Sequence, residues 1–532
     1  MPRELFSSVD TAWLRMEVPT NLMMVNGVLI LGAPLNFQRL KATLEHRLLD
    51  HFDRFRQRVV RPQLPIGPHY WEDDPDFHLD NHVTRIALSS RSSQAALQDV
   101  VSELMSTPLD FSRPLWHFHV IEKFGKGSVI IARVHHCIAD GIALVHVLLS
   151  LTDKSPNAPW PTAQPKEMPR PDWLGALFKP VQPALKITTR AARTLWREGD
   201  EILANPSHLR DLTRLGRENA MALGRLVLRW PDPPTLFKGE LGTAKRAAWS
   251  KPIPLQDVKE VGRMLNGTVN DVLLTAVAGA LRSYMLDRGD AADGISIRAV
   301  VPVNLRPLDV TPDLGNRFGL VFLTLPVGVP DPMDRLRELK RCMDELKSSP
   351  EPAVALGLLS LIGAVPPKVQ DMAMGIFAAK ATAVMTNVPG PKEKLYLAGA
   401  PLDTLMFWVP QSGRLGLGVS IFSYAGRVWL GVATDQGLAP DPEVIIAAFH
   451  AEFNTLSRVA RRKQAKRSKA IRPMATALDR SVHKVDRLLR DSQSASAGPE
   501  NTQAGCRAKT RAGQMCKNHP LPGSDYCRIH QR

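Results

Sequence analysis

The chain is poor in cysteine and has no long apolar segment. Only 5 of its 532 residues are cysteine, and three of these lie after residue 505. This number and placement exclude the disulfide framework of small secreted domains. No window approaches the ~18 unbroken apolar residues that a membrane-spanning helix needs, and residues 1–6 lack the basic start and apolar centre of a secretion signal. We therefore expect a cytoplasmic protein with no signal peptide and no transmembrane helix.

Most of the chain also lacks an excess of charge. The formal net charge is +16, but residues 456–532 contain eighteen Lys and Arg against five Asp and Glu. Residues 1–455 therefore hold 50 basic and 47 acidic groups and are almost neutral. A nucleic-acid-binding body would need a basic groove, so nucleic acid is not expected as a partner. The basic tail is free to contact anionic surfaces, so peripheral association with a membrane or a lipid inclusion is expected.

The hydrophobic pattern predicts an α/β protein with two mixed halves. Residues 1–153 and 247–456 alternate strand-like and helix-like stretches, and residues 154–246 form a proline-rich crossover with basic amphipathic helices. Those helices, at about 173–228, either pack on the body or lie on a membrane surface. Beyond 456 we expect a basic helix and a flexible linker over 457–505, and a separate end over 506–532. The main predicted strands are 26–31, 128–134, 295–302, 320–325, 383–387 and 428–434; the helices are 37–51, 142–149, 255–265, 270–286, 332–348 and a short one near 478–489.

The most informative motif begins at two adjacent histidines. His135 and His136 end the predicted strand 128–134, and Asp140 and Gly141 precede the predicted helix, which Asp140 is placed to cap. Imidazole gains and loses a proton near neutral pH, so a general base is the natural functional interpretation. The structural alternative is a pair of hydrogen-bonded histidines at the end of a strand.

Four further clusters occur where loops are expected. They are Pro114-Leu115-Trp116, Asn270-Asp271, Pro302-Val303-Asn304-Leu305-Arg306 with Gly315-Asn316-Arg317-Phe318 close behind, and Thr386-Asn387-Val388-Pro389-Gly390-Pro391. Each has a plain alternative as packing, a helix cap, a surface charge or a turn.

Taken together, these motifs resemble the bacterial wax ester synthase/diacylglycerol acyltransferase family. The opening Asp10-Thr11-Ala12-Trp13-Leu14-Arg15 and the following Asn21-Leu22-Met23 are also similar to it. The resemblance covers about residues 4–456. It implies two chloramphenicol-acetyltransferase-like halves with a channel between them, and acyl-CoA and a lipid alcohol as substrates. Acyl-CoA is then a substrate, and no cofactor is expected for catalysis.

The resemblance also implies roles for individual residues. His136 is the base that lets the alcohol attack acyl-CoA directly, and His135 is structural or shapes the pocket by a hydrogen bond. Asp140 points away from the substrate and pairs with an arginine, for which Arg306 is the candidate. Asn270 is the donor on the oxyanion side, and Asp271 supports its geometry. Gly141 would permit a tight turn or a close backbone approach.

The tail has a pattern of its own. Cys506, Cys516, Cys527 and His530 form the ligand set of a tetrahedral structural zinc site, although the long intervals differ from the usual paired Cys-x2-Cys. The alternatives are three free cysteines, or His519 in place of His530. A zinc-folded end would also suit recruitment of a protein partner.

The leading hypothesis is an acyl-CoA-dependent O-acyltransferase that makes triacylglycerol or wax ester. One rival keeps the chemistry but uses another alcohol or an amine as acceptor. A second rival is a non-catalytic lipid-surface protein. The intact histidine motif argues against this rival, because a non-catalytic protein would not need it.

Overall fold

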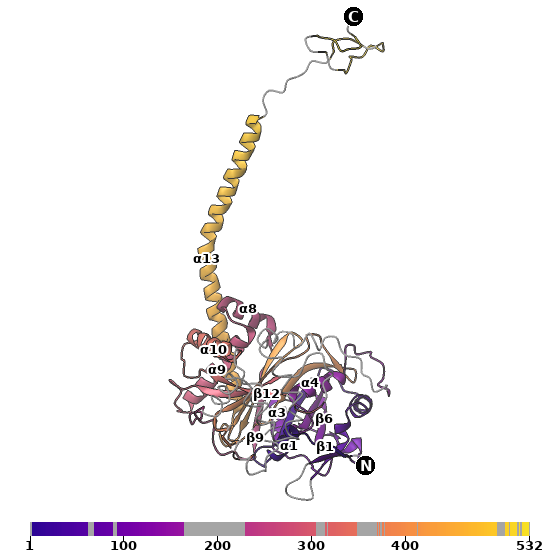
Figure 1. Ribbon diagram of the computed structural model, residues 1–532, viewed down its shortest axis with the longest axis vertical. Coiled ribbons are helices and arrows are strands. Elements are labelled where there is room, and N and C mark those ends of the chain that lie inside the picture. The colour runs from indigo at the N-terminus through magenta and orange to yellow at the C-terminus, as the bar shows by residue number, and fades with distance from the viewer. Residues whose placement is uncertain are drawn as a thin grey trace, which may run out of the picture. The chain divides into compact units, whose positions relative to one another are not determined.

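The computed structural model describes most of the chain (Figure 1). The described residues are all except 1–2, 62–68, 89–92, 164–228, 305–313, 317, 348–369, 371, 373–374, 377, 412, 497–505, 510, 519–520, 522–523 and 531–532. The chain forms two compact units, Met1–Arg461 and Arg462–Arg532. The predicted helices at 173–228 lie outside the described residues.

The first of two seven-stranded sheets contains the strand that ends at the histidines. Its strand order is β5-β6-β7-β2-β15-β14-β8. The bounds are β2 Met24–Leu31, β5 Val83–Arg85, β6 Trp116–Phe124, β7 Gly127–His135, β8 Thr152–Asp153, β14 Tyr396–Leu397 and β15 Ala400–Trp408. A separate three-stranded sheet is formed by β1 Arg3–Leu5, β4 Tyr70–Asp73 and β3 Gln57–Val60.

The second seven-stranded sheet belongs entirely to the C-terminal half. Its order is β10-β17-β16-β13-β11-β12, with β9 paired to β17. The bounds are β9 Lys245–Trp249, β10 Ile253–Pro254, β11 Ile297–Asn304, β12 Phe318–Leu325, β13 Ala383–Pro389, β16 Leu417–Tyr424 and β17 Arg427–Asp435. Both large sheets mix parallel and antiparallel pairs, which confirms the predicted α/β class.

Strand β15 connects the two halves of the chain. It comes from the C-terminal half but pairs antiparallel with β2 in the first sheet, with Leu405 opposite Leu29. The two predicted halves are therefore not two separate sheets, because residues 396–408 complete the N-terminal one. The exchange buries apolar side chains of both halves, such as Leu402 and Met406, in one core.

The helices are α1 Ser8–Arg15, α2 Phe37–Leu44, α3 Gln94–Met105, α4 Gly141–Ser150, α8 Leu255–Leu265, α9 Val269–Asp287, α10 Pro332–Lys347 and α13 Pro442–Ser496. Helices α4, α8, α9 and α10 lie close to their predicted positions, whereas α1 and α3 were not predicted. The predicted helix at 37–51 is α2 followed by a π-helical turn, Glu45–Leu49. In the tail the predicted helix near 478–489 was too short, since α13 spans 55 residues and continues to Ser496, into the stretch before 505 where the sequence predicted a flexible linker.

Alternation along the strands of the second sheet separates two cores. Leu417, Val419 and Ile421 of β16 face the core formed with α8, α9, α10 and the start of α13. Phe422 and Tyr424 of the same strand belong to the core of the first sheet. The second sheet is therefore covered by helices on one face and by the first sheet's core on the other.

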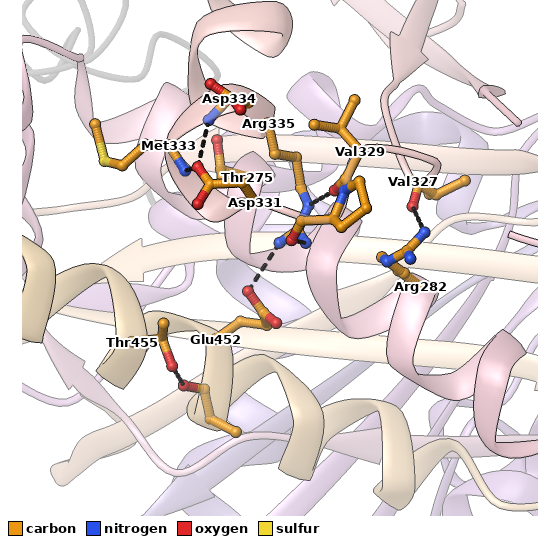
Figure 2. A network of polar contacts seen from close by, with 12 residues as sticks. Thr275, Arg282, Val327, Val329, Asp331, Met333, Asp334, Arg335, Glu452 and Thr455 are labelled. Atoms are coloured by element: carbon orange, nitrogen blue, oxygen red, sulfur yellow. Dashed lines mark hydrogen bonds and ion pairs between the residues drawn. The ribbon is translucent and has the colours of Figure 1, made fainter. Parts of the chain in front are cut away.

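A buried arginine ties three helices together (Figure 2). Arg335 of α10 is 1% exposed, and its guanidinium donates to Glu452 of α13 at 2.8 Å and to the Val329 carbonyl at 3.0 Å. Gly279 of α9 leaves the room, because a Cβ there would lie 2.3 Å from Arg335 Nη1. These contacts fix the first turns of α13 against α9 and α10 of the C-terminal half, and the same core extends to Ala460, which is fully buried. The body of the protein therefore ends after 456, close to Arg461.

No single described helix is long and apolar enough to cross a membrane. Helices α8 and α9, which meet at 93°, pass that test only as a bent pair and only by length and composition.

Candidate active site

The two histidines are fixed through their backbone by neighbouring strands. The His135 N–H donates to the Leu115 carbonyl at 2.9 Å, and the His136 N–H donates to the Met23 carbonyl at 2.7 Å. Leu115 belongs to the Pro114–Trp116 cluster, and Trp116 is buried and donates from its indole to the Phe55 carbonyl. The cluster therefore packs in the core and also positions the end of β7.

The His135 side chain acts as a brace. It is fully buried, and its Nδ1 accepts the Cys137 N–H at 3.1 Å. The ring proton is therefore assigned to Nε2, which lies 2.9 Å from Glu17 Oε2, at ion-pair distance but outside hydrogen-bond geometry. Glu17 Oε2 also accepts the Met23 N–H at 2.9 Å. Both nitrogens of His135 thus face groups of the protein, as expected for a structural residue.

The His136 ring packs against two aromatic side chains, which also contact each other. Its centroid is 4.1 Å from that of Trp13, in a stacked arrangement, and 5.7 Å from that of Phe318. Burial lowers its pKa to about 4, while the negative charge of Asp140 acts in the opposite direction. Near neutral pH the imidazole is therefore uncharged and has a lone pair with which to accept a proton.

A buried polar network holds the loop that carries His136. Asn316 donates from Nδ2 to the His136 carbonyl at 2.7 Å and to Asp10 Oδ1 at 2.8 Å. Arg54 donates to Asp10 Oδ2 and to the Ile138 carbonyl, both at 3.1 Å. The network joins four segments that are distant in sequence. The sequence motifs containing Asp10 and Asn316 were recognised without a role for either residue, and nothing in the sequence pointed to Arg54 or Glu17.

Asp140 caps helix α4, as predicted. Its Oδ1 accepts the Ala143 N–H at 2.9 Å, and its own N–H donates to the Gly315 carbonyl at 3.2 Å. Arg306 lies outside the described residues, so its pairing with Asp140 stays a prediction.

Two glycines near this loop differ in what they require. Gly315 has a φ of +115°, and a Cβ there would come within 3.3 Å of Arg54 Nη1. Gly141 has no such conformation, and a Cβ there would meet open space. The backbone of Gly141 therefore does not need a glycine for a tight turn, whereas that of Gly315 does, and a close approach of substrate to Gly141 stays a prediction.

The Asn-Asp pair marks the start of α9 in the second sheet's helical layer. Asp271 forms a capping box with Thr268, in which its carboxylate accepts the Thr268 N–H at 2.8 Å. Asn270 is exposed, and its Oδ1 accepts from Asn387 Nδ2 at 3.0 Å. Two of the four motif clusters thus meet each other. Among the described residues, no hydrogen bond joins Asn270 to His136.

The four candidate metal ligands of the tail also come together. The ligand atoms of Cys506, Cys516, Cys527 and His530 all lie within 4.8 Å of one another. His519 lies outside the described residues. This cluster belongs to the second compact unit.

Two solved structures share the fold of this chain. A wax ester synthase/diacylglycerol acyltransferase from Marinobacter aquaeolei VT8 matches with a TM-score of 0.61 and 20% identity, covering 86% of this chain and all of that one. The starter condensation domain of rhizomide synthetase matches with a TM-score of 0.53 and 14% identity, over 86% of this chain and 94% of that one. The chain therefore has the predicted two-lobed, chloramphenicol-acetyltransferase-like acyltransferase fold.

Sequence comparison gives the family. The model of the wax ester synthase/diacylglycerol acyltransferase catalytic domain matches residues 6–273, and that of its C-terminal domain matches residues 314–457. A probable diacylglycerol O-acyltransferase of Mycobacterium tuberculosis (strain H37Rv) is 27% identical over 469 residues, covering 87% of this chain and 97% of that protein. A second, putative one from strain CDC 1551 is 27% identical over 470 residues, covering 82% and 87%. The chain belongs to the wax ester synthase/diacylglycerol acyltransferase family, which confirms the resemblance found in the sequence.

The two histidines should respond differently to substitution. We expect His136→Ala to lower turnover by at least ~10², the usual contribution of a positioned base. His135→Ala should lower turnover less but destabilise the protein by about 1–3 kcal/mol, because the partly buried Glu17 carboxylate loses a partner. Steady-state rates and urea unfolding of both variants test this. The reverse order of rates at equal stability would contradict the assignment of His136.

Asp140→Asn separates charge from capping. Asparagine keeps a cap oxygen for the Ala143 N–H, so a loss of stability reports the lost charge. If the carboxylate pairs with Arg306, we expect a loss of about 3–5 kcal/mol. The rate should also fall, because the carboxylate charge no longer raises the pKa of His136. Unfolding and kinetics are measured together, with Asp140→Ala, which also loses the cap, as the comparison. A variant as stable as the wild type yet inactive would indicate a direct chemical role for Asp140.

Proposed function

We propose that this protein transfers a fatty acyl group from acyl-CoA to the hydroxyl of diacylglycerol, of a long-chain alcohol, or of both. The observation that carries the proposal is the buried, uncharged His136 at the end of β7, within a chain of this family. Acyl-CoA and the lipid alcohol would enter a channel between the two lobes from opposite faces.

The reaction needs one proton acceptor and no covalent intermediate. The alcohol gives its proton to His136 as its oxygen attacks the thioester carbonyl. The carbon–sulfur bond then breaks, and the leaving thiolate takes the proton back from the imidazolium to give free CoA. Asp140 supports this cycle, because its negative charge favours the imidazolium that forms midway. Asn270 is our candidate donor to the oxyanion, with Asp271 holding the helix turn on which it stands.

Direct transfer agrees with the state of the nearest thiol. Cys137 lies inside the motif but is fully buried, and burial raises the pKa of its thiol well above the usual value. A buried protonated thiol is a poor nucleophile. This supports a mechanism in which the alcohol itself attacks the thioester.

Product analysis tests the reaction. Purified protein is given a panel of acyl-CoAs with either diacylglycerol or a long-chain alcohol, and CoA release is measured together with ester formation. We expect ester and CoA in equal amounts, both lost in His136→Ala. CoA release only with an amine acceptor would reject this proposal in favour of the other acceptor class.

We further propose that the basic tail holds the enzyme at an anionic lipid surface. Helix α13 exposes Val482, Val485, Leu488 and Leu489 on one face. Arg480, Lys484, Arg487 and Arg490 point to the remaining faces and to solvent. A basic amphipathic helix of this kind suits the membrane interface, where each basic group contributes about 1 kcal/mol.

Truncation after Arg461 tests the tail while sparing the buried Ala460. Activity on detergent-dispersed substrate should be largely kept, and binding to anionic liposomes should fall. Binding of the full-length chain should weaken as salt rises, because charge attraction is screened. As a matched pair, Leu489→Glu should weaken binding and Asp479→Asn should not. Liposome binding that survives truncation unchanged would remove the tail from this role and turn attention to residues 173–178.

A further inference from the structure

The segment after residue 505 has almost no apolar core. Its buried cluster consists of Cys506, Cys516 and Cys527, with only Ala508 packed against them. Of its larger apolar side chains, Met515, Tyr526 and Ile529 are 57%, 44% and 76% exposed, and Leu521 is partly buried. Hydrophobic burial cannot hold a segment this short in one conformation, and small domains of this size rely on disulfides or metals instead.

The backbone explains the long spacing between the cysteines. Residues on either side of the Gly513 turn, where φ is +80°, pair as a hairpin through the bridge between Lys509 and Met515. The Cys516 N–H donates to the Ala508 carbonyl at 2.9 Å, and the Cys506 N–H donates to the Asn518 carbonyl at 3.2 Å. The nine residues between Cys506 and Cys516 therefore form a hairpin, and this hairpin brings the two thiols close together.

The third cysteine reaches the same point by a second backbone contact. The Arg507 N–H donates to the Asp525 carbonyl at 3.0 Å, which lays the segment before Cys527 along the hairpin. The His530 N–H then donates to the Cys527 carbonyl at 2.9 Å, closing a turn that returns the imidazole to the thiols. All four ligand groups are therefore placed by main-chain hydrogen bonds.

The separations of the ligand atoms fit a tetrahedral metal. Zn–S bonds of ~2.3 Å at tetrahedral angles place two sulfurs about 3.8 Å apart. Cys516 Sγ and Cys527 Sγ are 3.8 Å apart. His530 Nδ1 lies 3.7 Å from Cys506 Sγ and 3.2 Å from Cys527 Sγ.

Backbone donors point at two of the sulfurs. The Cys527 N–H lies 3.2 Å from Cys506 Sγ, and the Asn518 N–H lies 3.5 Å from Cys516 Sγ. Sulfur accepts both contacts, so they favour the thiolate, the form that binds a metal.

We propose that Cys506, Cys516, Cys527 and the Nδ1 atom of His530 bind one Zn²⁺ and that this ion folds the C-terminal segment. Three thiolates and an imidazole select zinc over magnesium or calcium, which prefer oxygen ligands. Four protein ligands leave no open position, so the ion is structural and takes no part in acyl transfer. The site lies beyond residue 457, where the family's C-terminal domain ends.

Metal analysis of the full-length protein tests the site. We expect one zinc per chain in the wild type and almost none in Cys516→Ser or Cys527→Ser. Cys342→Ser is the matched control, because Cys342 is a buried cysteine of α10 outside the cluster, and it should keep the full zinc content. Replacing zinc by cobalt should give the visible absorption of a tetrahedral site with thiolate ligands, lost in the same two variants.

The proposal separates cleanly from the acyltransferase reaction. Chelation should make the segment after 505 sensitive to protease while activity on detergent-dispersed substrate stays unchanged. Wild-type protein that contains no zinc and gives no tetrahedral cobalt spectrum would overturn the proposal. So would zinc that is retained in Cys516→Ser, or a Cys516–Cys527 disulfide in protein purified without oxidant.

Discussion

One buried carboxylate, Asp10, holds the candidate active site together. It is 1% exposed and is neutralised by Arg54 while it accepts a hydrogen bond from Asn316. The same two donors reach on to the carbonyls of His136 and Ile138. Removing one partner of a buried pair of this kind costs about 3–5 kcal/mol, because the other charge is left without compensation. The loop that carries His136 is thus fixed by groups from α1, from the segment before β3 and from the segment before β12.

This arrangement would let His136 be shielded from water and still act as the base that we propose. Packing against Trp13 and Phe318 shields the imidazole from water, and this burial favours its neutral form by lowering its pKa. A neutral ring can be buried at little electrostatic cost, whereas a permanently charged group could not. Burial becomes unfavourable only when the ring takes a proton. The negative charge of Asp140 then stabilises the imidazolium. Asp140 would thereby stabilise the positive charge on His136, which exists only during the proposed reaction.

Local signals in the sequence predicted the elements well and the long-range contacts poorly. Strand β7, helix α4 and its Asp140 cap were expected at almost their observed positions, because apolar periodicity and a capping residue are local features. The pairing of β15 with β2 was not predicted, because the local sequence of a buried strand does not indicate which strand it pairs with. Arg54 contacts Asp10 across 44 residues of sequence, and Glu17 contacts His135 across more than 100. Contacts this distant produce no periodic pattern in the sequence, so they could not be predicted from it.

Gly141 and the tail cysteines show what spacing alone can and cannot establish. Gly141 suggested a steric need, yet the constrained backbone lies at Gly315, which reaches the loop only through the fold. The intervals between the tail cysteines differ from the usual paired Cys-x2-Cys pattern of zinc sites. A hairpin nevertheless brings Cys506 and Cys516 together. In both cases the number of residues between two groups said little until the backbone path was known.

The division of charge follows the division into two units. The first unit is almost neutral. Its helices are held in place by a buried apolar core and by ion pairs such as Arg335–Glu452. The second carries most of the net charge, and its described residues form no comparable core. A substrate such as diacylglycerol is concentrated in a lipid surface, and an enzyme held there meets it at a far higher effective concentration than in water. A separate basic unit can supply that attraction without placing unpaired charge in the catalytic core, where each buried charge would need a partner.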